Sequence, residues 1–231
     1  MYEYLMWVLL LGVVWAILYV SQPAIRRKMW WSSWIAFPFG LGELYFIPNY
    51  WMPQTLFDLG MKYRIDIEAF LVMFFLGGIA AAIYEFVVRE YLPRAQKICR
   101  PICKCYAPLI ATLVAFIVLT RAFPAWNIIY SSSFACLAGG VMAALIYPNL
   151  RKHVILGGIL FALLYWISLA VIDLLFPGWI AQTWNMAALS GLTLVRVPLE
   201  EIFFGFSFGT IWAPLFEEVC SNLHIVMKGK K

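Results

Sequence analysis

Long apolar stretches follow one another along most of this chain, and they limit the folds available to it more than any other feature. A helix of about 20 apolar residues spans the hydrocarbon core of a bilayer, and most of the stretches approach that length. With 64% hydrophobic and 13% charged residues, the chain is predicted to be an all-α polytopic membrane protein. The seven predicted transmembrane helices are Tyr4–Val20, Trp31–Ile47, Ile67–Val88, Tyr106–Leu119, Ile128–Tyr147, Val154–Phe176 and Val197–Phe216.

The basic residues predict the orientation of these spans. Most Lys and Arg residues fall after the first, third, fifth and seventh spans, and the few on the other side are Lys62, Arg64, Arg121 and Arg196. Because basic loops stay in the cytoplasm, the N-terminus is predicted outside and the C-terminus inside a cell membrane, most simply a prokaryotic plasma membrane. The net charge of +5 then faces anionic membrane lipids, and no basic patch with interleaved aromatic residues suggests a nucleic-acid partner.

An acidic segment occurs twice in the chain without a gap. Ile67–Leu71 corresponds to Leu199–Phe203, and further upstream Glu43–Phe46 corresponds to Asp173–Phe176. The correspondence predicts two parallel three-helix repeats, residues 1–90 and 128–231, joined by a cytoplasmic loop and a linker helix in residues 91–127. In proteins built this way, functional sites tend to lie between the halves.

The repeats place carboxylates at matching depths, near the predicted outer ends of the spans. These acids are Glu43, Asp66, Glu68, Asp173, Glu200 and Glu201. A carboxylate inside a membrane is costly and marks a functional site by default. Crowded, desolvated carboxyl groups retain protons near neutral pH, as a general acid requires. Asp66 stands directly before its helix and is equally well placed to cap it. Glu85 is interpreted as a solvated charge at the cytoplasmic end, able to pair with a nearby Arg or Lys, and His153 as a surface residue on the same side.

The aromatic residues allow more than one interpretation. Trp51, Trp179 and Trp184 are most simply explained as an aromatic belt at the outer membrane interface. Phe203 and Phe204 directly follow the acid pair, so their rings either stabilise a carbocation by cation–π attraction or face lipid.

The segment Val197–Phe204, with the sequence VPLEEIFF, resembles the P-(L/I)-E-E-x-x-F motif of the membrane-embedded lycopene cyclases. In that family, which includes prokaryotic heterodimeric and fungal fused enzymes, a small three-helix domain occurs twice. The first half of this chain departs from the pattern, because Asp66 replaces the expected Pro and Ala69 the second Glu. That departure leaves room for a related reaction, such as hydration of the same cation.

The resemblance implies an enzyme that closes β-type rings on the ψ ends of lycopene, with no cofactor and no metal. A carboxylic acid protonates a terminal C=C, a neighbouring double bond attacks the cation, and a base removes a ring proton. The leading acid and base candidates are Glu200 and Glu201, and the matched acids Glu68, Glu43 and Asp173 are further catalytic candidates. The predicted substrate-binding residues are Phe203, Phe204 and Arg196.

A small-solute transporter and a non-catalytic scaffold subunit of polyene enzymes are the alternatives from other classes. Every Asn and Gln falls in or beside a loop, so the helix centres suit an apolar polyene better than a hydrated solute. The expected partners are therefore a lipophilic polyene, membrane lipids and other carotenoid enzymes. Paired glycines such as Gly77-Gly78 and Gly157-Gly158 are expected to allow close helix packing.

Overall fold

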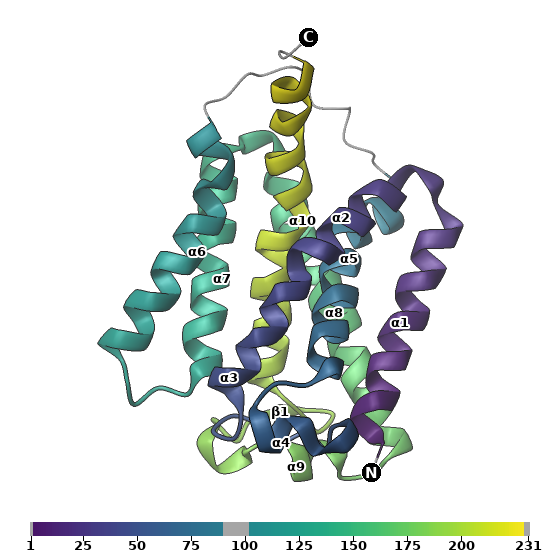
Figure 1. The fold of residues 1–231 in the computed structure, drawn as a ribbon, viewed down its shortest axis with the longest axis vertical. Coiled ribbons are helices and arrows are strands. Elements are labelled where there is room, and N and C mark those ends of the chain that lie inside the picture. The colour runs from purple at the N-terminus through teal and green to yellow at the C-terminus, as the bar shows by residue number, and fades with distance from the viewer. Residues whose placement is uncertain (1, 90–101, 229–231) are drawn as a thin grey trace.

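A computed structural model describes the backbone of residues 2–89 and 102–228 and the side chains of residues 2–89 and 106–216. Long helices run along the long axis of the molecule, and α1 begins at the opposite end from the end of α10 (Figure 1). The long helices are α1 Glu3–Ser21, α2 Arg26–Ala36, α5 Ile67–Val88, α6 Ile102–Ala122, α7 Ile128–Ile146, α8 Arg151–Leu175 and α10 Leu199–Lys228.

Short elements connect the long helices. Two-residue strands β1 Thr193–Leu194 and β2 Val197–Pro198 form an antiparallel hairpin, which departs from the all-α prediction. The short helices are η1 Pro23–Ile25, η2 Phe37–Gly42, α3 Glu43–Phe46, η3 Leu56–Asp58, α4 Leu59–Tyr63, η4 Pro148–Leu150, α9 Trp179–Thr183 and η5 Met186–Ala188.

Apolar helices confirm that the chain is of the helical membrane-protein class. Within the described residues, four segments are long and apolar enough to cross a membrane, and Tyr106–Ala122 is a shorter apolar helix. The four are Glu3–Ser21, Ile67–Val88, Ile128–Ile146 and Pro148–Leu175. The seven-span count, the repeat and the orientation stay predictions.

The second predicted span, Trp31–Ile47, is not one continuous α-helix. It passes from α2 into the 3₁₀ helix η2 at Phe37 and then into α3. The sequence explains the change, because Pro38 lacks a backbone donor and two glycines follow it in η2. Gly40 lies directly on α5, where an added Cβ would come within 2.8 Å of Phe70 Cα.

Glycines bring the helices together as the sequence predicted. A Cβ added to Gly77 of α5 would lie 2.3 Å from Ala36 Cβ of α2, and one added to Gly157 of α8 would lie 2.6 Å from Ala213 Cβ of α10. Both distances are too short for real atoms. The close α2–α5 and α8–α10 contacts therefore depend on the absence of these side chains.

Two residues at the end of the molecule where α10 ends differ from their predicted surface positions. Glu85 is buried, with its carboxylate 3.5 Å from the Lys28 ammonium. His153 is 3% exposed, and its ring lies 4.0 Å from that of Tyr84. The interpretation of both as solvated residues was wrong, because α5 packs against α2 and α8 there and covers these side chains. The expected pairing of Glu85 with a nearby base is confirmed by its contact with Lys28.

Candidate active site

The predicted carboxylates lie at the end of the molecule that holds α3, α4, α9 and the start of α1, here called the carboxylate end (Figure 1). They come from four places: α3, the start of α5, the end of α8 and the start of α10. All are at most 9% exposed: Glu43, Asp66, Glu68, Asp173, Glu200 and Glu201. Burial of so many acids at one end is the arrangement that the sequence predicted.

A pocket at this end brings only part of the candidate set together. Among the predicted site residues, Glu43, Glu201 and Phe204 line it, whereas the others do not. Most of the lining is aromatic or aliphatic. Its lining residues are Tyr4, Trp7, Phe39, Gly40, Gly42, Glu43, Phe46, Tyr50, Trp51, Ala69, Val72, Met73, Leu76, Ile129, Tyr165, Trp184, Glu201 and Phe204. Below, this space is called the acid pocket.

Glu201 is held by three hydrogen-bond donors. Tyr165 of α8 donates its hydroxyl to Oε2 at 2.6 Å, and the Trp184 indole N–H donates to Oε1 at 2.6 Å. The Tyr50 hydroxyl also donates to Oε1. Hydrogen bonds to a carboxylate favour its ionised form and fix its orientation. The sequence therefore builds a buried carboxylate whose two oxygens are both occupied by rigid aromatic donors.

Glu43 faces the same pocket from α3 with a much smaller set of donors. The Trp51 indole N–H donates to its Oε2 at 2.8 Å. Among the described residues, this is the one hydrogen bond that the Glu43 carboxyl group accepts. The Trp51 and Trp184 rings lie 5.3 Å apart, so the two indoles that bind the two acids also contact each other. The two carboxyl groups are thus linked through one aromatic pair.

Glu200 is adjacent to Glu201 but faces a different part of the structure. Its Oε1 accepts hydrogen bonds from the Tyr130 hydroxyl at 2.6 Å and from the Ser190 N–H at 2.7 Å. Consecutive residues of an α-helix point about 100° apart, so only one of the pair can face the acid pocket. Glu68, which the predicted repeat matches to Glu200, likewise accepts a hydrogen bond from a backbone N–H, that of Leu56, at 2.6 Å.

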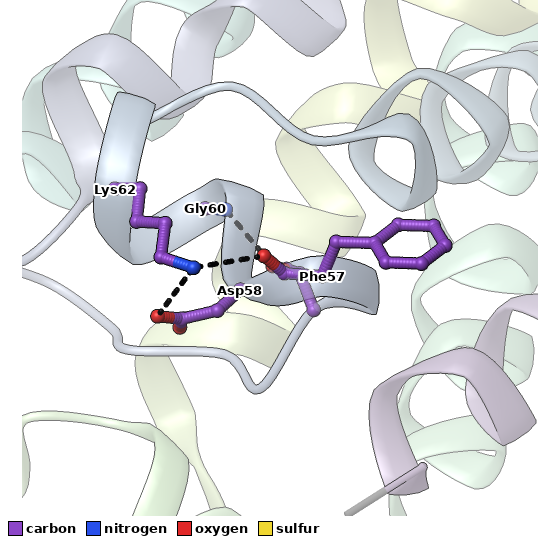
Figure 2. A network of polar contacts seen from close by, with 5 residues as sticks. Phe57, Asp58, Gly60 and Lys62 are labelled. Atoms are coloured by element: carbon purple, nitrogen blue, oxygen red, sulfur yellow. Dashed lines mark hydrogen bonds and ion pairs between the residues drawn. The ribbon is translucent and has the colours of Figure 1, made fainter.

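Asp66 caps α5, as the alternative interpretation of this residue proposed. Its Oδ1 accepts a hydrogen bond from the Ala69 N–H at 2.7 Å. Burial raises the pKa of Asp66 to about 6, against the lowering effect of that hydrogen bond. The nearby base Lys62 interacts with other groups at the surface instead of with Asp66. Its ammonium lies 3.9 Å from the Asp58 carboxylate and 3.4 Å from the Phe57 carbonyl oxygen (Figure 2).

The remaining candidates lie outside the acid pocket. Asp173 accepts a hydrogen bond from the Ile180 N–H at 3.0 Å, and its second oxygen is 3.6 Å from the exposed guanidinium of Arg196. Phe203 packs on Phe134, with ring centroids 5.2 Å apart. These contacts place Asp173 and Arg196 in an ion pair beside the site and Phe203 against α7.

The sequence did not identify the residues that donate hydrogen bonds to the pocket carboxylates Glu43 and Glu201. The predicted outer belt of Trp51, Trp179 and Trp184 was wrong, because all three are buried, at 7%, 6% and 3% exposure. The indoles of Trp51 and Trp184 donate hydrogen bonds to Glu43 and Glu201 instead of lying at the membrane interface. Tyr165 offered the one available signal, a hydroxyl in the middle of an apolar span that needs a buried partner.

The fold and the site define a helical membrane protein with an aromatic-lined pocket that two buried carboxyl groups face. Residues 127–219 match the family model described as Lycopene cyclase. This match confirms the predicted resemblance over the segment that contains α7, α8, Trp179, Trp184 and Glu201. No curated protein and no solved structure matches the chain.

Proposed function

We propose that this protein is an enzyme of carotenoid biosynthesis that cyclises the ψ ends of lycopene, or a closely related polyene, to β-type rings without a cofactor. One observation carries the proposal: Glu43 faces the same aromatic pocket as Glu201, which lies in the segment, residues 127–219, that matches the lycopene cyclase family model. The reaction is an isomerisation, so it needs a proton donor and a proton acceptor and no oxidant or reductant.

The different surroundings of the two carboxyl groups support different roles. Glu43 is buried and has one recorded donor, so it is the better proton donor to the terminal C=C. Glu201 is surrounded by three donors that favour its anion, so it is suited to stabilise the cation and then to remove the ring proton. Pairs of acids whose environments differ in this way commonly divide the acid and base roles.

The pocket lining suits a hydrocarbon cation. Rings of Trp7, Phe204 and Tyr165 line the space, and their faces can stabilise positive charge that forms on the polyene. Ala69 also lines it, at the position that the predicted repeat matches to Glu201. We therefore propose that the two halves, arranged as seven spans with the N-terminus outside a cell membrane, form one acid pocket that processes one polyene end at a time.

The test is expression of the chain in a bacterium that accumulates lycopene, followed by chromatography of the pigments. The wild-type chain should produce γ- or β-carotene. Glu43→Gln and Glu201→Gln should each lower conversion by about 10²–10⁴-fold, the usual contribution of a general acid or base. Glu200→Gln is the matched control, and because this side chain does not line the pocket, its conversion should stay within about tenfold of wild type.

Each variant is compared at equal membrane content, measured through a C-terminal tag. Full conversion by both Glu43→Gln and Glu201→Gln would contradict the proposed site. Unchanged lycopene with a well-expressed wild-type chain would contradict the proposed substrate and favour the transporter or scaffold alternative.

A further inference from the structure

A second pocket lies beside the acid pocket and has the opposite character. It opens at the surface of the carboxylate end, and exposed side chains such as Gln54 and Gln182 contribute to it. Four of its lining residues are polar: Glu3, Gln54, Gln182 and Thr183. We call it the polar pocket.

At three places in the chain, one residue lines the acid pocket and the residue next to it in the sequence lines the polar pocket. Tyr4, Trp51 and Trp184 line the acid pocket. The residues adjacent to them in the chain, Glu3, Met52 and Thr183, line the polar pocket. At these three places, adjacent residues of the chain therefore separate the two pockets.

Backbone hydrogen bonds fix two of these three places to each other. Trp51 and Trp184 form an antiparallel bridge, flanked by bonds from the Met52 N–H to the Thr183 carbonyl at 2.7 Å and from the Asn185 N–H to the Tyr50 carbonyl at 2.9 Å. Both indoles of the bridge line the acid pocket, whereas Met52 and Thr183, whose backbones are joined beside it, line the polar pocket.

Trp179 covers this bridge on the side of the polar pocket. It lines the polar pocket, and its ring meets that of Trp184 edge to face, with centroids 5.2 Å apart. No hydrogen bond to Glu43 or Glu201 is recorded for Trp179 among the described residues, unlike Trp51 and Trp184. It can therefore be altered without removing a donor from either acid.

We propose that the Trp51–Trp184 bridge and Trp179 form a barrier that keeps water from the polar pocket out of the acid pocket, and so determines that the cation loses a proton instead of gaining water. The inference rests on the proposed function. In cyclisation, one proton is added and another removed, so the product is an isomer. If water reached the cation, its oxygen would form a C–O bond, a carboxylate would take the released proton, and the product would be an alcohol.

The first test measures products in cells grown in ¹⁸O-labelled water. Trp179→Ala should yield a hydroxylated, ¹⁸O-containing pigment beside the cyclised one, whereas Trp179→Phe, which keeps a ring at this place, should yield the cyclised pigment alone. Trp126→Ala is the matched control, since it removes an exposed tryptophan that lines neither pocket. Cyclised pigment without ¹⁸O from a folded Trp179→Ala variant would overturn the barrier.

The second test does not depend on turnover. Val72 lines the acid pocket, so a Val72→Cys variant in nanodiscs reports access to it through its rate of reaction with a charged, membrane-impermeant thiol reagent. The chain without this added cysteine supplies the background. Adding Trp179→Ala should raise the labelling rate of Cys at this position at least tenfold, and an unchanged rate would overturn the barrier. If the wild-type chain leaves lycopene unaltered, the proposed function fails and the labelling result alone decides whether the barrier exists.

Discussion

The division of roles between the two pocket carboxylates depends on single hydroxyl and indole groups. Tyr165 donates from within α8 and Tyr50 from the loop after α3, so both halves of the chain contribute to Glu201. Burial, and then the nearby Glu201, raises the pKa of Tyr50 well above its usual range. Its hydroxyl therefore keeps its proton and continues to donate at every pH at which the protein would be assayed.

Removing the Tyr165 hydroxyl should impair turnover without removing the acid itself. A hydrogen bond to a charged group contributes roughly 1.5–3 kcal/mol, so Tyr165→Phe should lower the turnover rate by about 10- to 100-fold. Tyr19→Phe is the matched control, because that ring stacks on Trp15 and lines neither pocket. Equal rates for Tyr165→Phe and wild type, measured on purified enzyme, would show that the hydrogen bond has no part in catalysis.

Asp66 should make the stability of the protein depend on pH. Its pKa is about 6 in the folded protein and about 4 in an unfolded chain, so the folded state holds the proton more tightly. This contribution to stability is complete below pH ~4 and is lost as the pH rises through ~6, a change of roughly 1–3 kcal/mol. Asp66→Asn keeps an acceptor for the Ala69 N–H but cannot titrate.

The measurement is thermal unfolding in detergent between pH 4 and pH 8. The wild-type midpoint should fall across this range by more than that of Asp66→Asn, and the difference between the two curves gives the effect of Asp66 together with its electrostatic interactions with Glu43 and Glu68. Parallel curves would show that Asp66 does not titrate in this interval.

At the scale of elements, the α2–α5 contact leaves no room for a single added methyl group. Gly77→Ala would bring its Cβ to 2.3 Å from Ala36 Cβ and 2.8 Å from the Ser32 carbonyl oxygen, both of which belong to a rigid helix. Such overpacking typically costs 1–3 kcal/mol, so we expect a lower unfolding midpoint in detergent. Gly42→Ala, where the nearest atom lies 3.7 Å away, should leave the midpoint nearly unchanged. Equal midpoints would mean that the helices can separate at little cost.

The sequence predicted the apolar helices and the burial of the six carboxylates better than it predicted the partners of those carboxylates. Apolar length located α1, α5, α7 and α8, and the price of a carboxylate in a membrane correctly indicated that acids such as Glu201 are buried. It did not separate Glu200 from Glu201, because adjacent helical residues look alike until the neighbouring helices are placed. Trp184 was assigned to the membrane interface for a similar reason, since an indole suits an interface and a buried carboxylate equally well.

At the scale of the whole molecule, the positions of the helix ends constrain the number of membrane crossings. Four crossings alone would return the C-terminus to the side of the N-terminus. However, α1 begins and α10 ends at opposite ends of the long axis (Figure 1). An odd number of crossings fits this arrangement. The predicted seven spans are the four apolar helices together with the broken α2–α3 segment, α6 and α10.

Reporter fusions test this topology one loop at a time. Alkaline phosphatase needs disulfides and is active only outside the reducing cytoplasm, whereas green fluorescent protein reports the cytoplasm. We expect phosphatase activity from fusions after Arg64 and after Pro124, and fluorescence from fusions after Arg151 and at the C-terminus. The fusion after Arg64 tests α2–α3, because without that crossing the C-terminal end of α4 and the start of α1 could not lie on the same side of the membrane. Fluorescence after Arg64 or Pro124 would contradict the seven-span arrangement, and with it the placement of Glu43 and Glu201 near the outer face of the membrane.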